Sequence, residues 1–182
     1  MLSESVSQDV ERRLGYRFHD RSMLEMALTH RSWANEQELG VHYERAEFLG
    51  DAVLGLVVAH WLYRHRPEAS EGELSKLKSV IVSEPTLAEW ARQLGLGETL
   101  LLGVGEARSG GRDKPSLLAD ALEAVLGAIY LDGGLEAVRQ VTGSWLAASP
   151  SSDGGDLASA DAKTALQELA QSRRLELPVY RH

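Results

Sequence analysis

The chain has 182 residues, a formal net charge of −8 and no Cys. This length suffices for one hydrophobic core and a small appendage, and the lack of Cys excludes a disulfide framework. The acidic balance argues against a protein that binds nucleic acid over its whole surface, although a local basic strip or a carboxylate cluster neutralised by metal ions is compatible with it. No apolar run reaches the roughly 20 residues of a membrane span, and the first residues lack the regions of a signal peptide, so we expect a cytoplasmic protein with no membrane partner.

The first third of the chain is predicted to be largely helical. Apolar residues at four-residue spacing predict a helix over about 4–14, which Gly15 ends. A brief extended piece follows, and a second helix is expected over about 21–32, with Asp20 as its N-cap. A polar loop over 33–43 then leads to the next helix.

Two histidines in this region raise the question of catalysis. Adjacent His19 and Asp20 match a pattern found in a family of metal phosphohydrolases, but that chemistry needs further His at helical positions, and Asp20 is better interpreted as a cap. His30, near a helix end, is either a base or, as we favour, a hydrogen-bonded structural residue.

The stretch before Pro67 contains the first candidate functional residues. Apolar residues at three- and four-residue spacing predict a long helix from about residue 44, which we expect to be central and buried. Glu44, Glu47 and Asp51 lie in its first turns and share one face. Because an isolated buried carboxylate is costly to charge, these groups must reach solvent or be compensated by a cation. The apolar positions include Phe48, Ala52, Val53, Leu56 and Val57.

The middle of the chain is predicted to form two more helices and a flexible loop. Ser70 and the acids after it predict a helix over about 71–83, and a second helix is expected over 85–94. The Gly-rich segment 96–115 lacks the strand and the third Gly of a nucleotide-binding loop, so we expect a flexible loop. The inward positions of the first helix are Leu74, Leu77, Val80 and Ile81. Lys76 and Lys78 are candidate phosphate contacts, for which a solvated face is the alternative. The candidate contacts in the loop are Arg108, Arg112 and Lys114.

A second acidic helix is predicted over 117–131. Asp120 and Glu123 are its charged residues, and they lie three apart on one face. Two apolar helices that each carry acids predict a pocket that holds a divalent cation, and oxygen-only ligands favour Mg²⁺ or Mn²⁺. From spacing alone, ordinary solvated helix faces remain the alternative. A turn over 132–134 and a helix over 135–147 follow.

Five blocks of sequence stand out along the chain. They are Leu28–Ser32, Glu44–Leu54, Gly72–Leu77, Leu118–Ala124 and Ile129–Gly134. Together they resemble the ribonuclease III family of double-stranded-RNA endonucleases. The similarity is colinear over nearly the whole chain, which makes it far more specific than one motif. Ala46 stands where the family usually has Leu, at a packing position that carries no chemistry.

The resemblance implies an all-α catalytic domain over 1–147 that cleaves duplex RNA with Mg²⁺, for which Mn²⁺ can substitute. It also implies a homodimer with one active site per subunit, 5′-phosphate products with short 3′ overhangs, and roles in the processing of rRNA and mRNA. The implied metal ligands are Glu47, Asp120 and Glu123. The implied catalytic acids are Asp51 and Glu123, and the secondary acidic positions are Glu44 and Glu71. Phe48 is expected to pack across the two-fold axis, with an intrachain core position as the alternative.

The C-terminal part of the chain is predicted to be a linker and an incomplete module. Residues 148–160 are rich in Ser, Gly and Asp, which predicts a flexible linker. Residues 161–182 resemble the first helix and the start of a strand of an α/β double-stranded-RNA-binding domain, whose remaining elements do not follow. Its candidate RNA contacts are Lys163, Gln167, Arg173 and Arg174. Alternatives to the nuclease are a non-catalytic RNA-binding relative, a compact family member without an RNA-binding domain, and a small-molecule metal phosphohydrolase.

Overall fold

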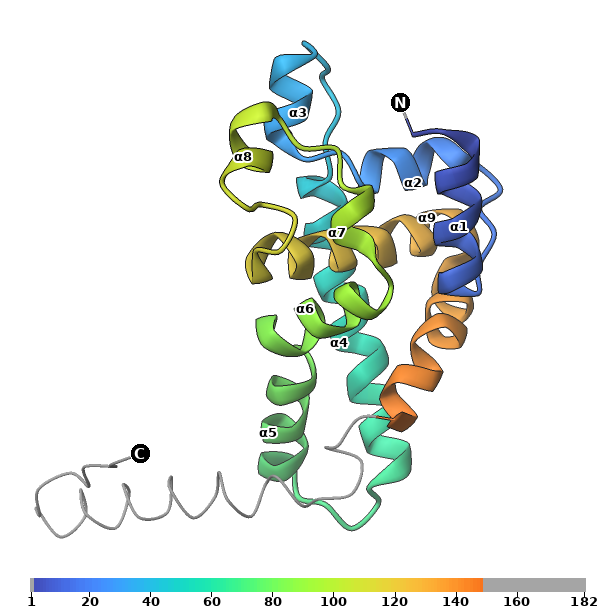
Figure 1. Cartoon of the computed structure of the whole chain (residues 1–182). Helices are drawn as coiled ribbons and strands as arrows, with labels where there is room; N and C mark the ends of the chain where they lie inside the picture. Colours follow the sequence, from blue (N-terminus) through green and yellow to red (C-terminus); the bar gives the residue numbers. More distant parts are fainter. Residues whose placement is uncertain (1, 149–182) are drawn as a thin grey trace, which may run out of the picture. The chain divides into compact units, whose positions relative to one another are not determined.

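The computed structural model describes residues 2–148, and the fold over that range is all-α, as the sequence predicts (Figure 1). Apart from Ala148, the linker predicted over 148–160 lies outside the described residues. So does the incomplete domain predicted over 161–182, with all four of its candidate RNA contacts. The helices are α1 (Glu4–Leu14), α2 (Arg21–Ala27), α3 (Arg31–Glu36), α4 (Glu44–His65), α5 (Glu71–Ile81), α6 (Glu84–Gln93), α7 (Leu96–Thr99), α8 (Val104–Arg108) and α9 (Pro115–Ala148).

Capping residues set where several helices begin and end. The side chains of Ser3 and Asp20 each accept a backbone N–H at the start of the helix that follows. Ser70 and Glu73 form a reciprocal capping box at the start of α5. Gly15, with a φ of 67°, ends α1 in the left-handed conformation that favours glycine. The predicted stop at Gly15, the N-cap at Asp20 and the helix start at Ser70 are confirmed.

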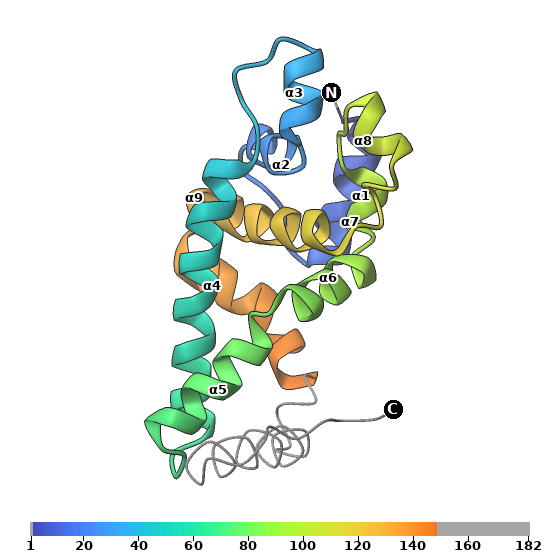
Figure 2. The same ribbon diagram turned by 90° about the vertical axis from the view of Figure 1, so that its left-hand side faces the viewer.

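The core is centred on the first half of α9. Leu118, Leu122 and Leu126 of this helix are almost completely buried, whereas α4 buries one side, through Leu54 and Val58 among others. Both views show α4 crossing α9, and α5 packs alongside α4 (Figures 1 and 2). The sequence is right that two apolar helices form the framework, but α9 is the more deeply buried of the two.

The outer face of α4 corrects the expectation of a buried central helix. Phe48 is 81% exposed, Leu56 55% and Tyr63 75%, and Ala52 is exposed beside them. These residues share one face, and no described element covers it. Val80 of α5 was likewise expected to face inward and is exposed. Among the described residues, α4 is the one helix that could cross a membrane by length and composition alone, a test that core helices also pass.

The predicted helix over 21–32 is wrong, because α2 ends at Ala27 and α3 begins at Arg31. The backbone between them pairs with a distant segment instead of continuing the helix. The N–H of Leu101 donates to the carbonyl of Leu28 at 2.9 Å, and the N–H of His30 donates to the carbonyl of Leu101 at 3.1 Å. As a consequence, α3 occupies the start of the predicted polar loop over 33–43.

The Gly-rich segment over 96–115 is also more structured than predicted, because it forms α7 and α8. The guanidinium of Arg112 donates from one nitrogen to the carbonyls of Gly97, Glu98 and Leu100, at 2.9, 3.1 and 3.0 Å. These contacts tie the end of the segment back to α7. A side chain that the sequence offers as a phosphate contact therefore also has a structural task.

The predicted break after the second acidic helix is confirmed, although α9 continues to Ala148. Gly134 has a φ of 77° and a ψ of −176°, a conformation that is open essentially to glycine alone. The helix changes direction there, and its second half buries Val138 and Leu146. The acids of the first half therefore lie on a separate helical segment, before Gly134.

Candidate active site

The contact between α4 and α9 depends on two glycines. A Cβ atom added at Gly50 of α4 would overlap the backbone carbonyl of Glu123, and one added at Gly127 of α9 would overlap the carbonyl of Ala46. The two helices therefore cross with their backbones in direct contact. This close approach brings the acidic turns of both helices together.

Three carboxylates meet at the crossing. Glu47 comes from α4, Asp120 and Glu123 come from α9, and one oxygen of each lies within 4.8 Å of the others. All three side chains are half-buried. Asp51, one turn beyond Glu47 on α4, is exposed and remains outside this trio. The structure thus brings together the three residues that the sequence analysis assigns as metal ligands.

The trio is electrostatically strained. Burial, together with the charges of Asp51, Glu47 and Asp120, raises the pKa of Glu123 to about 8. Burial also raises the pKa of Glu47, with Asp120, Glu44 and Asp51 adding to the shift. The pKa of Asp120 is raised by burial and by Glu84, and Lys114 partly opposes this shift. Without further positive charge, the Glu123 carboxyl favours keeping its proton near neutral pH.

A divalent cation fits this donor set. Hard cations such as Mg²⁺ and Mn²⁺ take oxygen ligands, and three oxygens less than 5 Å apart can all contact one ion. The raised pKa values show that the local charge is uncompensated, which a bound cation would correct. Glu47, Asp120 and Glu123 are therefore the residues that could hold a metal.

A polar cavity of about 690 Å³ adjoins the trio. Glu47 and Asp120 form part of its wall, and His30, Arg31 and Lys114 contribute the basic side chains. Burial lowers the pKa of His30, whose Nδ1 accepts the N–H of Ser32 at 3.2 Å and lies 2.7 Å from its hydroxyl. His30 caps α3 and has the structural role that we favour from the sequence.

Comparison with known proteins identifies the family of this chain. A family model described as ribonuclease-III-like matches residues 20–149. The protein named Ribonuclease 3 of Alcanivorax borkumensis is 49% identical over 92% of this chain and 72% of its own length. The chain belongs to the ribonuclease III family. Ribonuclease 3 of Geobacter sulfurreducens is 47% identical over 96% of this chain and 71% of its own length. The protein is accordingly an endoribonuclease of the ribonuclease III type.

Solved structures of ribonuclease III relatives share the fold. The nuclease domain of ribonuclease III from Campylobacter jejuni matches with a TM-score of 0.72 and 42% identity, over 76% of this chain and 94% of that one. Dicer from Pichia stipitis matches more distantly, with a TM-score of 0.51 and 27% identity, over 71% of this chain and 57% of that one. The resemblance stated from the sequence is therefore confirmed.

The secondary acids lie outside the trio. Glu44 is exposed at the start of α4, 3.5 Å from the guanidinium of Arg31 and 3.8 Å from the imidazole of His42. Glu71 is exposed at the start of α5 and accepts a hydrogen bond from the hydroxyl of Ser75 at 2.7 Å. Neither belongs to the group of carboxylates that could share one cation among the described residues.

The candidate RNA contacts are spread over several elements. Lys76 and Arg108 are exposed, and Lys78 is half-buried on α5. Lys114 pairs with Glu106 at 3.8 Å and lines the cavity, whereas Arg112 binds three backbone carbonyls. Their roles in RNA binding stay predictions.

Asp132 is a residue whose importance sequence reasoning missed. Its carboxylate accepts the hydroxyl of Tyr16 at 2.6 Å and the backbone N–H groups of His19 and Asp20 at 2.8 and 2.9 Å, and the His19 ring is 3.1 Å away. Burial alone would raise its pKa, but these hydrogen bonds lower the pKa to about 2. The sequence over 132–134 predicts a turn, and it does not indicate that Asp132 anchors α9 to the segment before α2.

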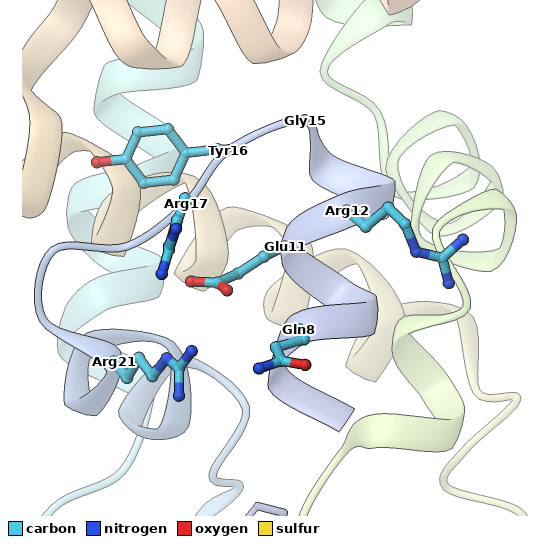
Figure 3. A pocket seen from close by; sticks show the side chains of 7 residues that line it. All are labelled: Gln8, Glu11, Arg12, Gly15, Tyr16, Arg17 and Arg21. Carbon is cyan, nitrogen blue, oxygen red and sulfur yellow. The ribbon is translucent and has the colours of Figure 1, made fainter. Parts of the chain in front are cut away.

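A second polar cavity, of about 460 Å³, lies where α1 meets the segment leading to α2 (Figure 3). Its basic residues are Arg12, Arg17 and Arg21. Arg17 and Arg21 lie on the same side as the Glu11 carboxylate, whereas the side chain of Arg12 points away from it. Glu11 is 7% exposed and accepts the N–H of Phe18 at 2.9 Å, so it fixes the turn after α1. None of the predicted site residues lines this cavity, which belongs to the structural framework.

Proposed function

We propose that this ribonuclease III family member is a divalent-metal-dependent endonuclease that hydrolyses double-stranded RNA. The observation that carries the proposal is the carboxylate trio of Glu47, Asp120 and Glu123 at the crossing of α4 and α9. The relatives named Ribonuclease 3 support the same activity. We propose Mg²⁺ as the ion, with Mn²⁺ as a substitute, because the donor set consists of oxygens alone.

The trio would hold the metal, and neighbouring residues would manage water and protons. When bound, the ion neutralises charge on the scissile phosphate and makes a water molecule a better nucleophile near neutral pH. Asp51 is exposed beside the trio and is close enough to contribute to the raised pKa of Glu123. We propose that the Asp51 carboxylate orients the attacking water and accepts its proton.

The reaction is the hydrolysis of a phosphodiester. The water oxygen attacks phosphorus, the bond from phosphorus to the 3′ oxygen breaks, and that oxygen takes up a proton. The products carry a 5′-phosphate and a 3′-hydroxyl. An RNA duplex is recognised through its shape, its phosphates and its 2′-hydroxyls, so little base specificity is expected. We propose that the substrates include rRNA and mRNA precursors in the cytoplasm.

The activity is tested by incubating the protein with long duplex RNA, single-stranded RNA and free nucleotides, each with Mg²⁺, with Mn²⁺ and with EDTA. We expect cleavage of the duplex alone, in the presence of either metal, with 5′-phosphate ends on the fragments. Cleavage in EDTA would contradict the metal dependence. Preferential hydrolysis of nucleotides would favour a small-molecule phosphohydrolase instead.

We also propose that the protein works as a homodimer through the exposed face of α4. The Campylobacter jejuni nuclease domain is described as flexible in a region involved in dimer formation. In this chain, Phe48 projects an exposed ring from α4. Residues Arg45, Ala46 and Leu49 of the same helix line an apolar cavity of about 620 Å³, whose wall also includes Met23, Met26 and Leu131. An isologous contact would place Phe48 of each protomer in the cavity of its partner.

Phe48→Ala tests this interface. Because the ring is exposed within one chain, we expect little change in the stability of the monomer. Loss of a buried aromatic anchor from an interface typically costs at least about 2 kcal/mol. Because the substitution removes one anchor from each protomer, the Kd of the dimer should rise by roughly 1,000-fold. Sedimentation over a dilution series measures this, with Val80→Ala, an exposed apolar residue on α5, as the control. A dimer of undiminished affinity would remove Phe48 from the interface.

A further inference from the structure

The polar cavity beside the trio contains cations that the metal chemistry does not use. Arg31 lies at the start of α3, and Lys114 immediately precedes α9, so the two charges reach the cavity from different elements. The polar groups of Asn35 and Ser116 also line it. At about 690 Å³, the cavity lies within the range of roughly 300–1,000 Å³ that small-ligand sites occupy.

Each of these cations has an acidic neighbour outside the trio. The guanidinium of Arg31 lies 3.5 Å from Glu44, and the ammonium of Lys114 lies 3.8 Å from Glu106. Both cationic side chains are more than half exposed. Ion pairs of this kind contribute about 0–1 kcal/mol, so a phosphate can replace the carboxylate partner at little cost.

The backbone around the two cations is firmly held. The N–H of Gly103 donates to the hydroxyl oxygen of Ser32 at 2.9 Å, and the N–H of Val104 donates to Glu36 at 2.9 Å. These bonds join α3 to α8, which lie side by side in both views (Figures 1 and 2). Arg112 fixes the chain just before Lys114 to three carbonyls. The cavity is therefore pre-formed around its two cations.

We propose that this cavity is an RNA subsite, in which Arg31 and Lys114 bind a backbone phosphate next to the one that is cleaved. The proposal rests on the proposed function and deepens it. Glu44 and Glu106 then act as positioning residues, which hold the two cations until the phosphate arrives. This gives Glu44, an acid that lies outside the metal-binding trio, a task of its own.

Charge balance supports a phosphate as the occupant. The cavity wall carries the carboxylates of Glu44, Glu47, Glu106 and Asp120 against two permanent cations. A divalent cation at the trio would cancel the excess negative charge, and Arg31 and Lys114 would then face an anion without net repulsion. Guanidinium offers a planar fork to phosphate oxygens, and ammonium offers a compact charge, so the pair suits a phosphodiester.

The test measures RNA binding apart from cleavage. Arg31→Met and Lys114→Met are each made in a Glu123→Gln background, which binds duplex RNA without cutting it. We expect each substitution to weaken binding about 10-fold at moderate salt, as loss of a charge-assisted contact does. Each should also lower the slope of log K against log salt by about 1. Arg92→Met is the matched control, because Arg92 forms a similar exposed pair with Glu89 at 3.6 Å on α6.

Charge-conserving variants and kinetic measurements distinguish an effect on RNA binding from an effect on folding or on metal binding. Arg31→Lys and Lys114→Arg keep the charge, so they should restore most of the salt slope, which a merely structural role would not predict. In the catalytically competent chain, Arg31→Met and Lys114→Met should raise KM more than they lower the single-turnover rate at saturating Mg²⁺.

The outcomes distinguish this inference from the function on which it rests. If the unsubstituted chain neither binds nor cleaves duplex RNA, the proposed function fails. If it does both, and the two Met variants bind with the affinity and salt slope of Arg92→Met, the subsite alone is wrong.

Discussion

Two carboxyl groups on α9 differ in the direction in which the fold shifts their pKa. Glu123 faces Asp51, Glu47 and Asp120, and its pKa is raised to about 8. Asp132, less than three turns further along, accepts hydrogen bonds from Tyr16, His19 and Asp20, and its pKa is lowered to about 2. Burial opposes ionisation at both positions, so the neighbours decide the outcome.

The difference separates an anchor from a site that is prepared for a ligand. At Asp132 the chain itself satisfies the charge, and the carboxylate fixes the segment after α1 to the end of the first half of α9. At Glu123 the fold brings several carboxylates together, and their negative charge must be compensated by a ligand from outside the chain. The first arrangement stabilises the fold, whereas the second stores an unfavourable interaction that a cation relieves.

Glu123→Gln should produce the largest effect. Loss of one metal-binding carboxylate should lower single-turnover cleavage of duplex RNA in Mg²⁺ by more than about 100-fold, because even outer partners of metal ligands cost 10–100-fold. The fold and RNA binding should persist. Glu136→Gln, an exposed position on the same helix, is the control. Cleavage near the wild-type rate at limiting Mg²⁺ would show that Glu123 is no ligand.

Asp132→Asn should have the opposite profile, with a loss of stability and little loss of the chemical step. The side chain is 3% exposed, and the fall of its pKa from 3.8 to about 2 corresponds to roughly 2 kcal/mol of folding free energy. Chemical denaturation of the Asn variant at neutral pH measures this loss, again beside Glu136→Gln. A variant as stable as the control would mean that the anchor is replaceable.

The pH dependence of stability should have opposite signs for the two groups. Glu123 has an ordinary pKa of 4.5 when unfolded and about 8 when folded, so the folded state binds more protons between these values. The unfolding free energy of the metal-free protein should therefore fall as pH rises through this window. For Asp132 the unfolded state binds more protons between about 2 and 3.8, so its stabilisation is complete above that range and is lost below it.

Melting temperatures in EDTA between pH 5 and 8 measure the first of these slopes. Glu123→Gln should flatten the decline, and Mg²⁺ should reduce it in the wild-type chain because the ion binds the ionised trio. Identical slopes for the wild type and the Gln variant would contradict the raised pKa.

The acids themselves could be predicted from the sequence, because spacing on a helix determines which side chains share a face. Asp120 and Glu123 are three apart, Glu47 lies in the first turn of another apolar helix, and the structure brings them together. What unites them is the contact at Gly50 and Gly127, which depends on two backbones meeting. A single sequence does not show which residue lies opposite a glycine.

Other features could not be predicted because their partners are distant in the sequence. The backbone of Leu101 pairs with the segment between Leu28 and His30, and this pairing ends α2 early. The local periodicity of the sequence does not indicate such a distant partner. The pattern of α4 identifies Leu56 as apolar, but apolar spacing is the same whether a face packs within the chain or against another molecule. Asp132 gains its importance from Tyr16, more than a hundred residues earlier.

The direct contact of backbones at Gly50 and Gly127 has a consequence for the interpretation of mutational scans. A methyl group at either position would push α4 away from α9 and spread the carboxylates, although every acid would still be present. In a saturation screen for loss of RNA cleavage, these two glycines would score alongside Asp120 and Glu123. Residues without a functional group would then be classified as catalytic. A screen that measures activity alone would therefore overestimate the number of catalytic residues.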